Sequence, residues 1–258
     1  MSSDARKRLG LIGLGRFGQF AALHLRQHFE VVAADRANLR QVARKLQVHW
    51  ATLAEAASCP YVVLAVPVQS FQQVLGEIGA HTQAGSLVID VGSVKVRPVQ
   101  QMLAALPEEV EILGTHPMFG PQSAARSLRG QRIVLCPVRT ERLERARSFL
   151  VERMGLDVIV CDAETHDREI AHTQALAQFV GRALAALEES ESAVRTPAYD
   201  YLRKAADTVG EDTWELFAAI QNLNSHAATI REELLAHLQN LQAELAADRA
   251  PDSSTASD

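Results

Sequence analysis

Residues 9–36, LGLIGLGRFGQFAALHLRQHFEVVAADR, constrain the fold of this chain more than any other stretch. The first apolar residues, 9–12, are expected to form a buried strand, and an amphipathic helix is expected to follow to about Gln27. A second apolar run, residues 31–34, is expected to be another strand. The order strand, glycine-rich turn, helix and strand predicts a βαβ unit at the start of a Rossmann-type sheet.

Three glycines in the spacing G-x-G-x-x-G lie between the first strand and the helix. Gly13 permits the tight turn, Gly15 lets a pyrophosphate approach the backbone, and Gly18 lets helix and strand pack closely. The helix N-terminus then offers unpaired N–H groups and a partial positive charge to phosphates. The alternative is a βαβ turn that needs glycine for its geometry alone.

The acid at the end of the second strand, Asp35, is placed to accept hydrogen bonds from a ribose diol. Its carboxylate would repel a 2′-phosphate, so we expect NAD rather than NADP. The neighbouring Arg36 could turn outward and accept that phosphate, which keeps NADP open. The other cofactor-binding candidates near these residues and strand ends are Arg16, Phe17, Val66 and Ser93.

Composition excludes several classes of protein. Hydrophobic residues make up 47% of the 258 residues and the formal charge is -5, so the chain has a core but no basic field for nucleic acid. No apolar run approaches the ~20 residues of a membrane span, and the N-terminus leaves no room for a signal peptide, so we expect a cytoplasmic protein. The cysteines lack metal-ligand spacing and are expected to be reduced thiols; they are Cys59, Cys136 and Cys161.

Strand and helix signals alternate up to residue 162 and then give way to helix signals alone. We therefore expect an α/β fold: a mostly parallel dinucleotide-binding domain, residues 1–162, and an all-helical substrate and dimerisation domain, residues 163–246. Helices are expected over 163–189, 199–207 and 211–246, with a turn-rich break at 190–197 and a disordered tail at 247–258. The apolar stripe of the last helix is too long for so small a domain to cover, which predicts a homodimer.

Reactive side chains are expected at the carboxyl ends of the strands, where open α/β sheets bind ligands. Ser93 follows a predicted strand and could bind a substrate hydroxyl or a nicotinamide, or it could cap the next helix. His116 follows a predicted strand at 110–114, in a loop that Pro117 should hold rigid. It is the best general-base candidate, with a structural histidine as the alternative. The pair His166 and Asp167 could be a first-turn acid and an orienting hydrogen bond.

Four motifs together resemble the prephenate/arogenate dehydrogenase family of tyrosine biosynthesis. They are GLIGLGRFGQF at the front, DVGSVK at 90–95, GTHPMFGP at 114–121 and HDREIAHTQALAQFVGRAL at 166–184. The resemblance covers nearly the whole ordered chain and is greatest to the plant arogenate dehydrogenase branch. It implies a Rossmann domain, a helical dimerisation domain and oxidative decarboxylation of a cyclohexadienyl acid, with hydride passing to nicotinamide.

The resemblance also implies roles for individual residues. His116 matches the histidine that takes the 4-hydroxyl proton, and Ser93 matches the serine beside that hydroxyl. Gln178 stands where the family usually has a substrate-binding histidine, and Lys204 where it has an arginine for a substrate carboxylate. Further substrate-side candidates are His172 and Gln174. Two other functions remain open: a dehydrogenase of another small carboxylate, and a family member that binds cofactor without catalysis.

Overall fold

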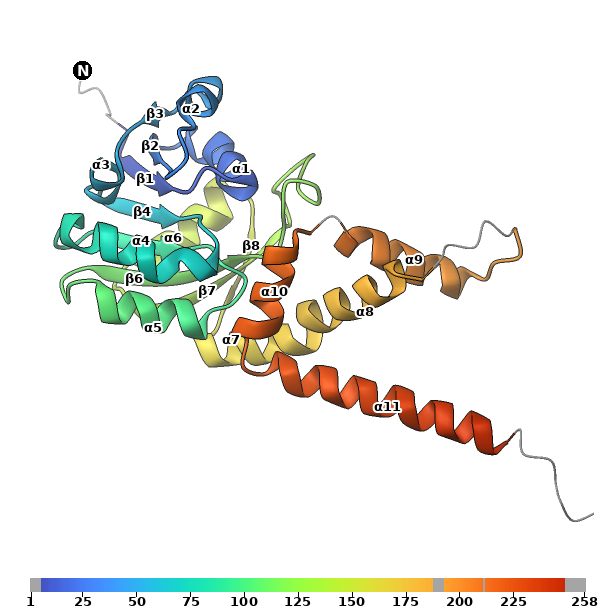
Figure 1. The fold of residues 1–258 in the computed structure, drawn as a ribbon. Coiled ribbons are helices and arrows are strands. Elements are labelled where there is room, and N and C mark those ends of the chain that lie inside the picture. The colour runs from blue at the N-terminus through green and yellow to red at the C-terminus, as the bar shows by residue number, and fades with distance from the viewer. Residues whose placement is uncertain (1–5, 188–192, 211, 249–258) are drawn as a thin grey trace, which may run out of the picture.

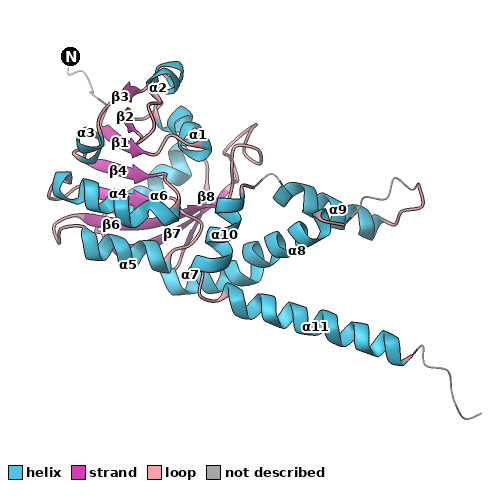
Figure 2. Ribbon diagram, viewed as in Figure 1, coloured by secondary structure: helices cyan, strands magenta, loops and turns pink. Residues whose placement is uncertain are grey.

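An eight-stranded sheet with helices on both faces forms the first part of the chain in the computed structural model, which describes residues 6–187, 193–210 and 212–248 (Figures 1 and 2). The strands lie in the order β3-β2-β1-β4-β5-β6-β7-β8. Their bounds are β1 Arg8–Ile12, β2 Glu30–Ala34, β3 His49–Trp50, β4 Tyr61–Leu64, β5 Leu87–Asp90, β6 Glu111–Pro117, β7 Arg132–Arg139 and β8 Asp157–Val160.

The strand pairing confirms the predicted mostly parallel, Rossmann-type sheet. Every neighbouring pair is parallel except β6 and β7, which run antiparallel. The sequence did not predict β3 or the helix α3 (Leu53–Ala57), because both are very short. A capping box marks the start of α3, since Thr52 accepts a hydrogen bond from the Glu55 N–H and the Glu55 carboxylate accepts one from the Thr52 N–H.

Alternate side chains of each strand point to opposite faces, and a different set of helices covers each face. On what we call the α5 face, Val88 and Ile112 pack with Phe71 and Met102. On what we call the α6 face, the side chains of β1, β5, β6 and β7 pack beneath α1, α2 and α6. The helix bounds are α1 Arg16–Leu25, α2 Arg40–Leu46, α4 Phe71–Ile78, α5 Val96–Ala105 and α6 Leu143–Ser148, the last continued by a π-helical segment, Phe149–Arg153.

All elements found after β8 in the described residues are helices. They are α7 Ala163–Ile170, a π-helical segment Ala171–Ala175, α8 Leu176–Ala185, α9 Pro197–Gly210, α10 Trp214–Leu223 and α11 Ala227–Ala247. The last of these, α11, projects away from the sheet (Figure 1), with Leu238 and Leu241 more than half exposed. None of the described helices is long and apolar enough to cross a membrane.

The predicted continuous helix over 211–246 is wrong, because the chain breaks between α10 and α11. Asn224 adopts an extended backbone conformation there, and its side chain accepts a hydrogen bond from the His226 N–H at 2.9 Å. Thr213 starts α10 by accepting from the Leu216 N–H. The predicted helix over 199–207 is longer in the structure, as α9. Residues 188–192, which include the end of the predicted helix 163–189, and tail residues 249–258 lie outside the described residues.

Candidate active site

The glycine-rich turn has the geometry that its spacing predicts. Gly13 has a φ of +100°, and its N–H donates to the carbonyl of Ala34 at 2.9 Å. A Cβ on Gly18 would lie 2.0 Å from the Gly13 carbonyl oxygen, so helix and turn touch there. A Cβ on Gly15 would meet nothing within 4 Å, and no side chain caps α1. The turn therefore leaves open space before the first N–H groups of α1, which fits a pyrophosphate.

Asp35, which is expected to bind a ribose diol, also stabilises the glycine-rich turn. One carboxylate oxygen accepts from the Leu14 N–H at 2.7 Å and the other from the Ala37 N–H at 2.9 Å. Arg36 points to α4, where its guanidinium donates to Gln73 and forms an ion pair with Glu77 at 2.9 Å. The arginine is therefore already paired with a carboxylate. Of the other predicted cofactor residues, Arg16 and Phe17 open α1, and Val66 packs against Gly13.

His116 lies inside a strand, not in the loop that the sequence predicts. It is the sixth residue of β6 and pairs with Val134 of β7. The strand is longer than the predicted 110–114 because β7 pairs with it as far as Pro117. His116 points to the α5 face and is 2% exposed. Burial, followed by the nearby charges of His166 and Lys95, lowers the pKa of His116 well below its ordinary value.

A buried chain of hydrogen bonds runs from His116 to the N-terminus of α5. Its Nδ1 lies 2.9 Å from Nε2 of His166, and Nδ1 of His166 lies 2.8 Å from Oδ1 of Asp167. The Asp167 carboxylate also accepts from the backbone N–H groups of Lys95 at 2.7 Å and Val96 at 2.9 Å. The sequence singled out the pair His166 and Asp167, but not its contact with His116, which is fifty residues away in the chain.

The carboxylate of Asp167 fixes which nitrogen of each ring carries hydrogen. Because a carboxylate only accepts, Nδ1 of His166 carries a hydrogen and, in the neutral ring, its Nε2 accepts. We therefore assign the hydrogen of neutral His116 to Nδ1, which leaves a lone pair on Nε2. This is the tautomer that a general base needs if the substrate approaches Nε2.

Lys95 was missed as a site residue, although the motif at 90–95 places it five residues after an acid. Its side chain is fully buried, and its Nζ donates to the Asp90 carboxylate and, at 2.5 Å, to the carbonyl of Thr115. Burial raises the pKa of Asp90, and the Lys95 charge opposes that shift. The Thr115 hydroxyl donates to the Asp90 carbonyl at 2.7 Å, so β5 and β6 are tied beside His116.

Ser93 lies half-buried in the loop between β5 and α5, at the same sheet edge as the glycine turn. The interpretation of Ser93 as the cap of α5 is wrong. The helix begins after Lys95, no side chain at the cap position bonds to it, and the Asp167 carboxylate accepts its first N–H groups instead. The Ser93 hydroxyl is therefore not required for starting the helix.

In the described part of the chain, no hydrogen bond, ion pair or ring contact joins the predicted substrate-side residues to His116. Gln178 is buried in α8 and donates to the Asp212 carboxylate at 2.7 Å. Its amide oxygen and that of Gln174 are buried and find no partner among the described residues. Lys204 is exposed on α9. A cation that the sequence interpretation missed, Arg182, lies one turn after Gln178 and stacks over the Phe217 ring at 4.7 Å.

Comparisons with known proteins agree with this arrangement. Residues 21–160 match the family model described as the nucleotide-binding domain of prephenate dehydrogenase. Arogenate dehydrogenase 1 of Arabidopsis thaliana, a chloroplastic protein, is 27% identical over 95% of this chain, which spans 40% of that relative. A probable arogenate/prephenate dehydrogenase of Methanocaldococcus jannaschii is 29% identical over 88% of this chain and 53% of its own length.

Solved structures show the same fold. A Synechocystis arogenate dehydrogenase superposes with a TM-score of 0.68 at 22% identity, over 95% of this chain and 94% of its own. Prephenate dehydrogenase of A. aeolicus, solved with hydroxyphenyl propionate and NAD+, gives 0.72 at 20% identity, over 96% and 93%. The glycine turn, the histidine on β6 and the family match all agree with the resemblance seen in the sequence motifs: the chain belongs to the prephenate dehydrogenase family.

Proposed function

We propose that the protein is an NAD-dependent dehydrogenase that oxidatively decarboxylates arogenate or prephenate in tyrosine biosynthesis. The observation that carries the proposal is His116, a buried imidazole whose Nδ1 is engaged by His166 and whose Nε2 is free to accept a proton. It lies on β6, next to the strand β5 that leads to Ser93. The family of the chain makes a cyclohexadienyl acid the natural substrate class.

The residues of the glycine turn fit a dinucleotide, which supplies a hydride acceptor when bound. Gly13, Gly15 and Gly18 would cradle the pyrophosphate, with Arg16 and Phe17 above the start of α1 and Val66 and Ser93 toward the nicotinamide. Asp35 would bind the adenosine ribose through its remaining lone pairs. Because Arg36 is already paired with Glu77, it is poorly placed to serve a 2′-phosphate, which favours NAD over NADP.

This cofactor choice is tested by comparing binding of NAD and NADP to the wild type and to Asp35→Ala. The variant loses the ribose contact and the repulsion of a 2′-phosphate, so its preference should shift toward NADP. Arg36→Ala is the control and should leave NAD binding nearly unchanged. Tighter binding of NADP than NAD by the wild type would reverse the assignment.

In the proposed reaction, Nε2 of His116 takes the proton of the substrate 4-hydroxyl as hydride leaves the same carbon. Ser93 Oγ lies at the neighbouring strand end and would hydrogen-bond that hydroxyl. Loss of carbon dioxide then leaves its electron pair in the ring, which becomes aromatic. His166 and Asp167 act as positioning residues, since they hold the ring and tautomer of His116 and do not touch the substrate.

The helical part supplies the other end of the proposed substrate site. The unpartnered amide oxygens of Gln174 and Gln178 can accept hydrogen bonds from an N–H donor. Arogenate carries an ammonium where prephenate carries a keto group, so these acceptors would favour arogenate if the substrate side chain reaches α8. Lys204 can pair with a substrate carboxylate only if the assembly brings α9 to a site, because the side chain is exposed within one chain.

We propose that α11 forms much of a homodimer interface, which supports the predicted helical dimerisation domain. Its exposed leucines recur on one stripe; they are Leu238, Leu241 and Leu245, with Leu234 half-buried beside them. Leu234→Glu with Leu238→Glu should convert a dimer into monomers or aggregates in sedimentation. The control, Gln239→Glu with Gln242→Glu, adds the same charge outside the stripe and should remain dimeric. A monomeric wild type at micromolar concentration contradicts the proposal.

Turnover of the purified protein tests the proposed function directly. Each combination of arogenate or prephenate with NAD+ or NADP+ is assayed for reduced nicotinamide, and arogenate with NAD+ should give the highest specificity constant. A higher specificity constant for prephenate would reverse the substrate preference without changing the reaction class. Cofactor binding without turnover of either acid would instead support a dehydrogenase of another small carboxylate or a non-catalytic family member.

A further inference from the structure

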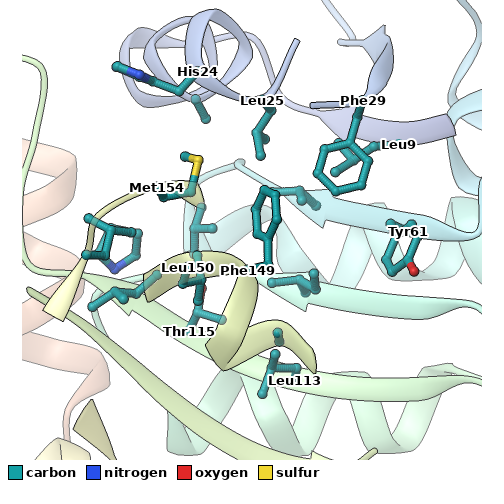
Figure 3. Close-up of a pocket in the computed structure, with 18 of the residues that line it drawn as sticks. Leu9, His24, Leu25, Phe29, Tyr61, Leu113, Thr115, Phe149, Leu150 and Met154 are labelled. Carbon is teal, nitrogen blue, oxygen red and sulfur yellow. The ribbon is translucent and has the colours of Figure 1, made fainter. Parts of the chain in front are cut away.

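The α6 face of the sheet holds an apolar cavity of about 270 Å³ between α1 and α6 (Figure 3). Its floor is made by side chains of β1, β4, β5, β6 and β7, including Leu9, Leu113 and Thr115. Leu25 projects from α1 above it, and Leu150 lies on the opposite wall. Aliphatic side chains make up most of the lining, and aromatic rings are set among them; they are Phe17, Phe20, Phe29, Tyr61, Phe119 and Phe149.

A space of this size is unusual inside a sheet protein. Protein interiors pack as densely as organic crystals, and the few voids they contain are small. An apolar cavity of this kind favours apolar molecules, because water finds few polar partners in it. The volume lies just below the usual range for drug-sized ligands, so the occupant should be a smaller molecule.

The mouth of the cavity is positively charged. Lys7, Arg142 and Arg145 line it at the amino-terminal edge of the sheet, where Arg142 is already neutralised by Glu111 at 2.9 Å. Lys7 and Arg145 are exposed, and neither has a carboxylate partner within the described ranges. Lys7 instead lies 5.9 Å from the centre of the Tyr61 ring. Two uncompensated cations at an apolar opening are complementary to one carboxylate.

We infer that this cavity binds a small aromatic carboxylate, with the ring among the phenylalanines and the acid between Lys7 and Arg145. Rings pack against rings in edge-to-face and offset arrangements that the tilted aromatic lining offers, which favours an aryl group over an alkyl chain. The cavity lies on the opposite face of the sheet from His116, although Phe17, which we place beside the cofactor, lines one end of it. The inference therefore does not depend on the proposed function.

Calorimetric titration of the full chain with 3-phenylpropanoate tests the inference. The wild type should show saturable binding at a site that Ala21→Leu and Ala146→Leu weaken at least tenfold, since these side chains fill the cavity from its two walls. Arg145→Gln should weaken binding about tenfold by removing one charge-assisted hydrogen bond. The matched control is Arg147→Gln on the same helix, where Arg147 faces Glu144 instead of the cavity, and its binding should be unchanged.

A second control, His116→Ala, tests whether the active centre contributes to the binding: this variant should bind 3-phenylpropanoate as the wild type does, and should lose affinity when Ala146→Leu is added to it. Thermal melts of both filled variants establish that they are folded. No saturable binding, or binding that neither filled variant weakens, overturns the inference. Tighter binding of octanoate than of 3-phenylpropanoate overturns the aromatic part of it. Because no outcome depends on turnover, a failed cavity and a failed catalytic assignment give different results.

Discussion

The two faces of the sheet differ in how they are packed, although consecutive residues of β6 contribute to both. On the α5 face, β6 presents His116 to a buried polar network joined by hydrogen bonds, in which one Asp90 oxygen is without a partner among the described residues. On the α6 face, the next residues on either side, Thr115 and Pro117, line an apolar cavity. A polar network in a protein interior must be packed precisely, because each unpaired group costs free energy. An apolar face tolerates empty space, and here the tolerance leaves room for a ligand.

The largest expected effect is on turnover, when one histidine on each face is replaced by alanine. His116→Ala on the α5 face should lower turnover by about two to four orders of magnitude, the usual contribution of a general base, with cofactor affinity nearly unchanged. His24→Ala, at the cavity on the α6 face, should leave turnover near that of the wild type. Steady-state kinetics of both variants make the comparison. Near-normal turnover of His116→Ala would mean that another residue is the base.

The pH dependence of turnover gives a second test of the role of His116 on the α5 face. Only the neutral ring of His116 can act as a base, and its pKa is lowered well below 6.5. Activity should therefore persist as pH falls below 6.5 and decline only when the pH passes through the lowered pKa. Folding favours the neutral form of His116, because its pKa is lower in the folded protein than in the unfolded chain. The stability of the fold is therefore unaffected by this group above the pKa of the unfolded chain, and it decreases as the pH falls from there toward the lowered pKa of the folded protein. The His116→Ala variant should lack this limb of the rate profile.

A smaller loss is expected when the network is disturbed one step away from the base. Asp167→Asn keeps the size of the side chain but no longer enforces the hydrogen on Nδ1 of His166. Turnover should fall about tenfold to a hundredfold, the range for groups that orient a functional ligand, and KM should change little. The acid limb of the rate profile should also move, which loss of stability alone would not cause.

The matched control for this change is Glu164→Gln, an exposed position on the same helix that contacts His226 at 2.7 Å. Its turnover should equal that of the wild type. If both variants lose activity equally, the effect belongs to the helix and not to the buried network, and the positioning role of Asp167 is excluded.

The smallest expected effect is on the free energy of unfolding, when an alanine on each face is replaced by leucine. Ala56→Leu on the α5 face should destabilise the fold by about 1–3 kcal/mol, because Ala56 is fully buried against Gly10 of β1. Ala21→Leu on the α6 face should be neutral or stabilising, because its methyl groups enter the cavity. Urea unfolding of the two variants measures the difference. Equal destabilisation would show that the cavity is not available space.

The parts of the structure that follow from local sequence were predicted well. The glycine turn, the alternation of strand and helix and the mostly parallel sheet all depend on residues close together in the chain, and the structure confirms them. The strand position of His116 was not predicted, because it depends on pairing with β7. The break at Asn224 was missed for a similar reason. Its side chain donates to the Asp167 carbonyl at 2.6 Å, across 57 residues of sequence.

The buried network and the cavity could not be deduced from spacing at all. The pairing of Lys95 with Asp90 needs the carbonyl of Thr115 from another strand to complete it. The cavity results from how far α1 and α6 stand apart, and no local pattern encodes that distance. Sequence motifs indicated which residues matter for chemistry, whereas their partners became visible only in three dimensions.

The two roles of Asp167 make the chain less modular than its sequence suggests. A gene fragment that stops at residue 162 would contain the complete sheet, the glycine turn and His116. It would nevertheless lack the carboxylate that caps α5 and the imidazole that holds His116. Grafting this sheet onto a different helical partner would therefore transfer the glycine turn and His116, but not the hydrogen bonds that position the His116 ring.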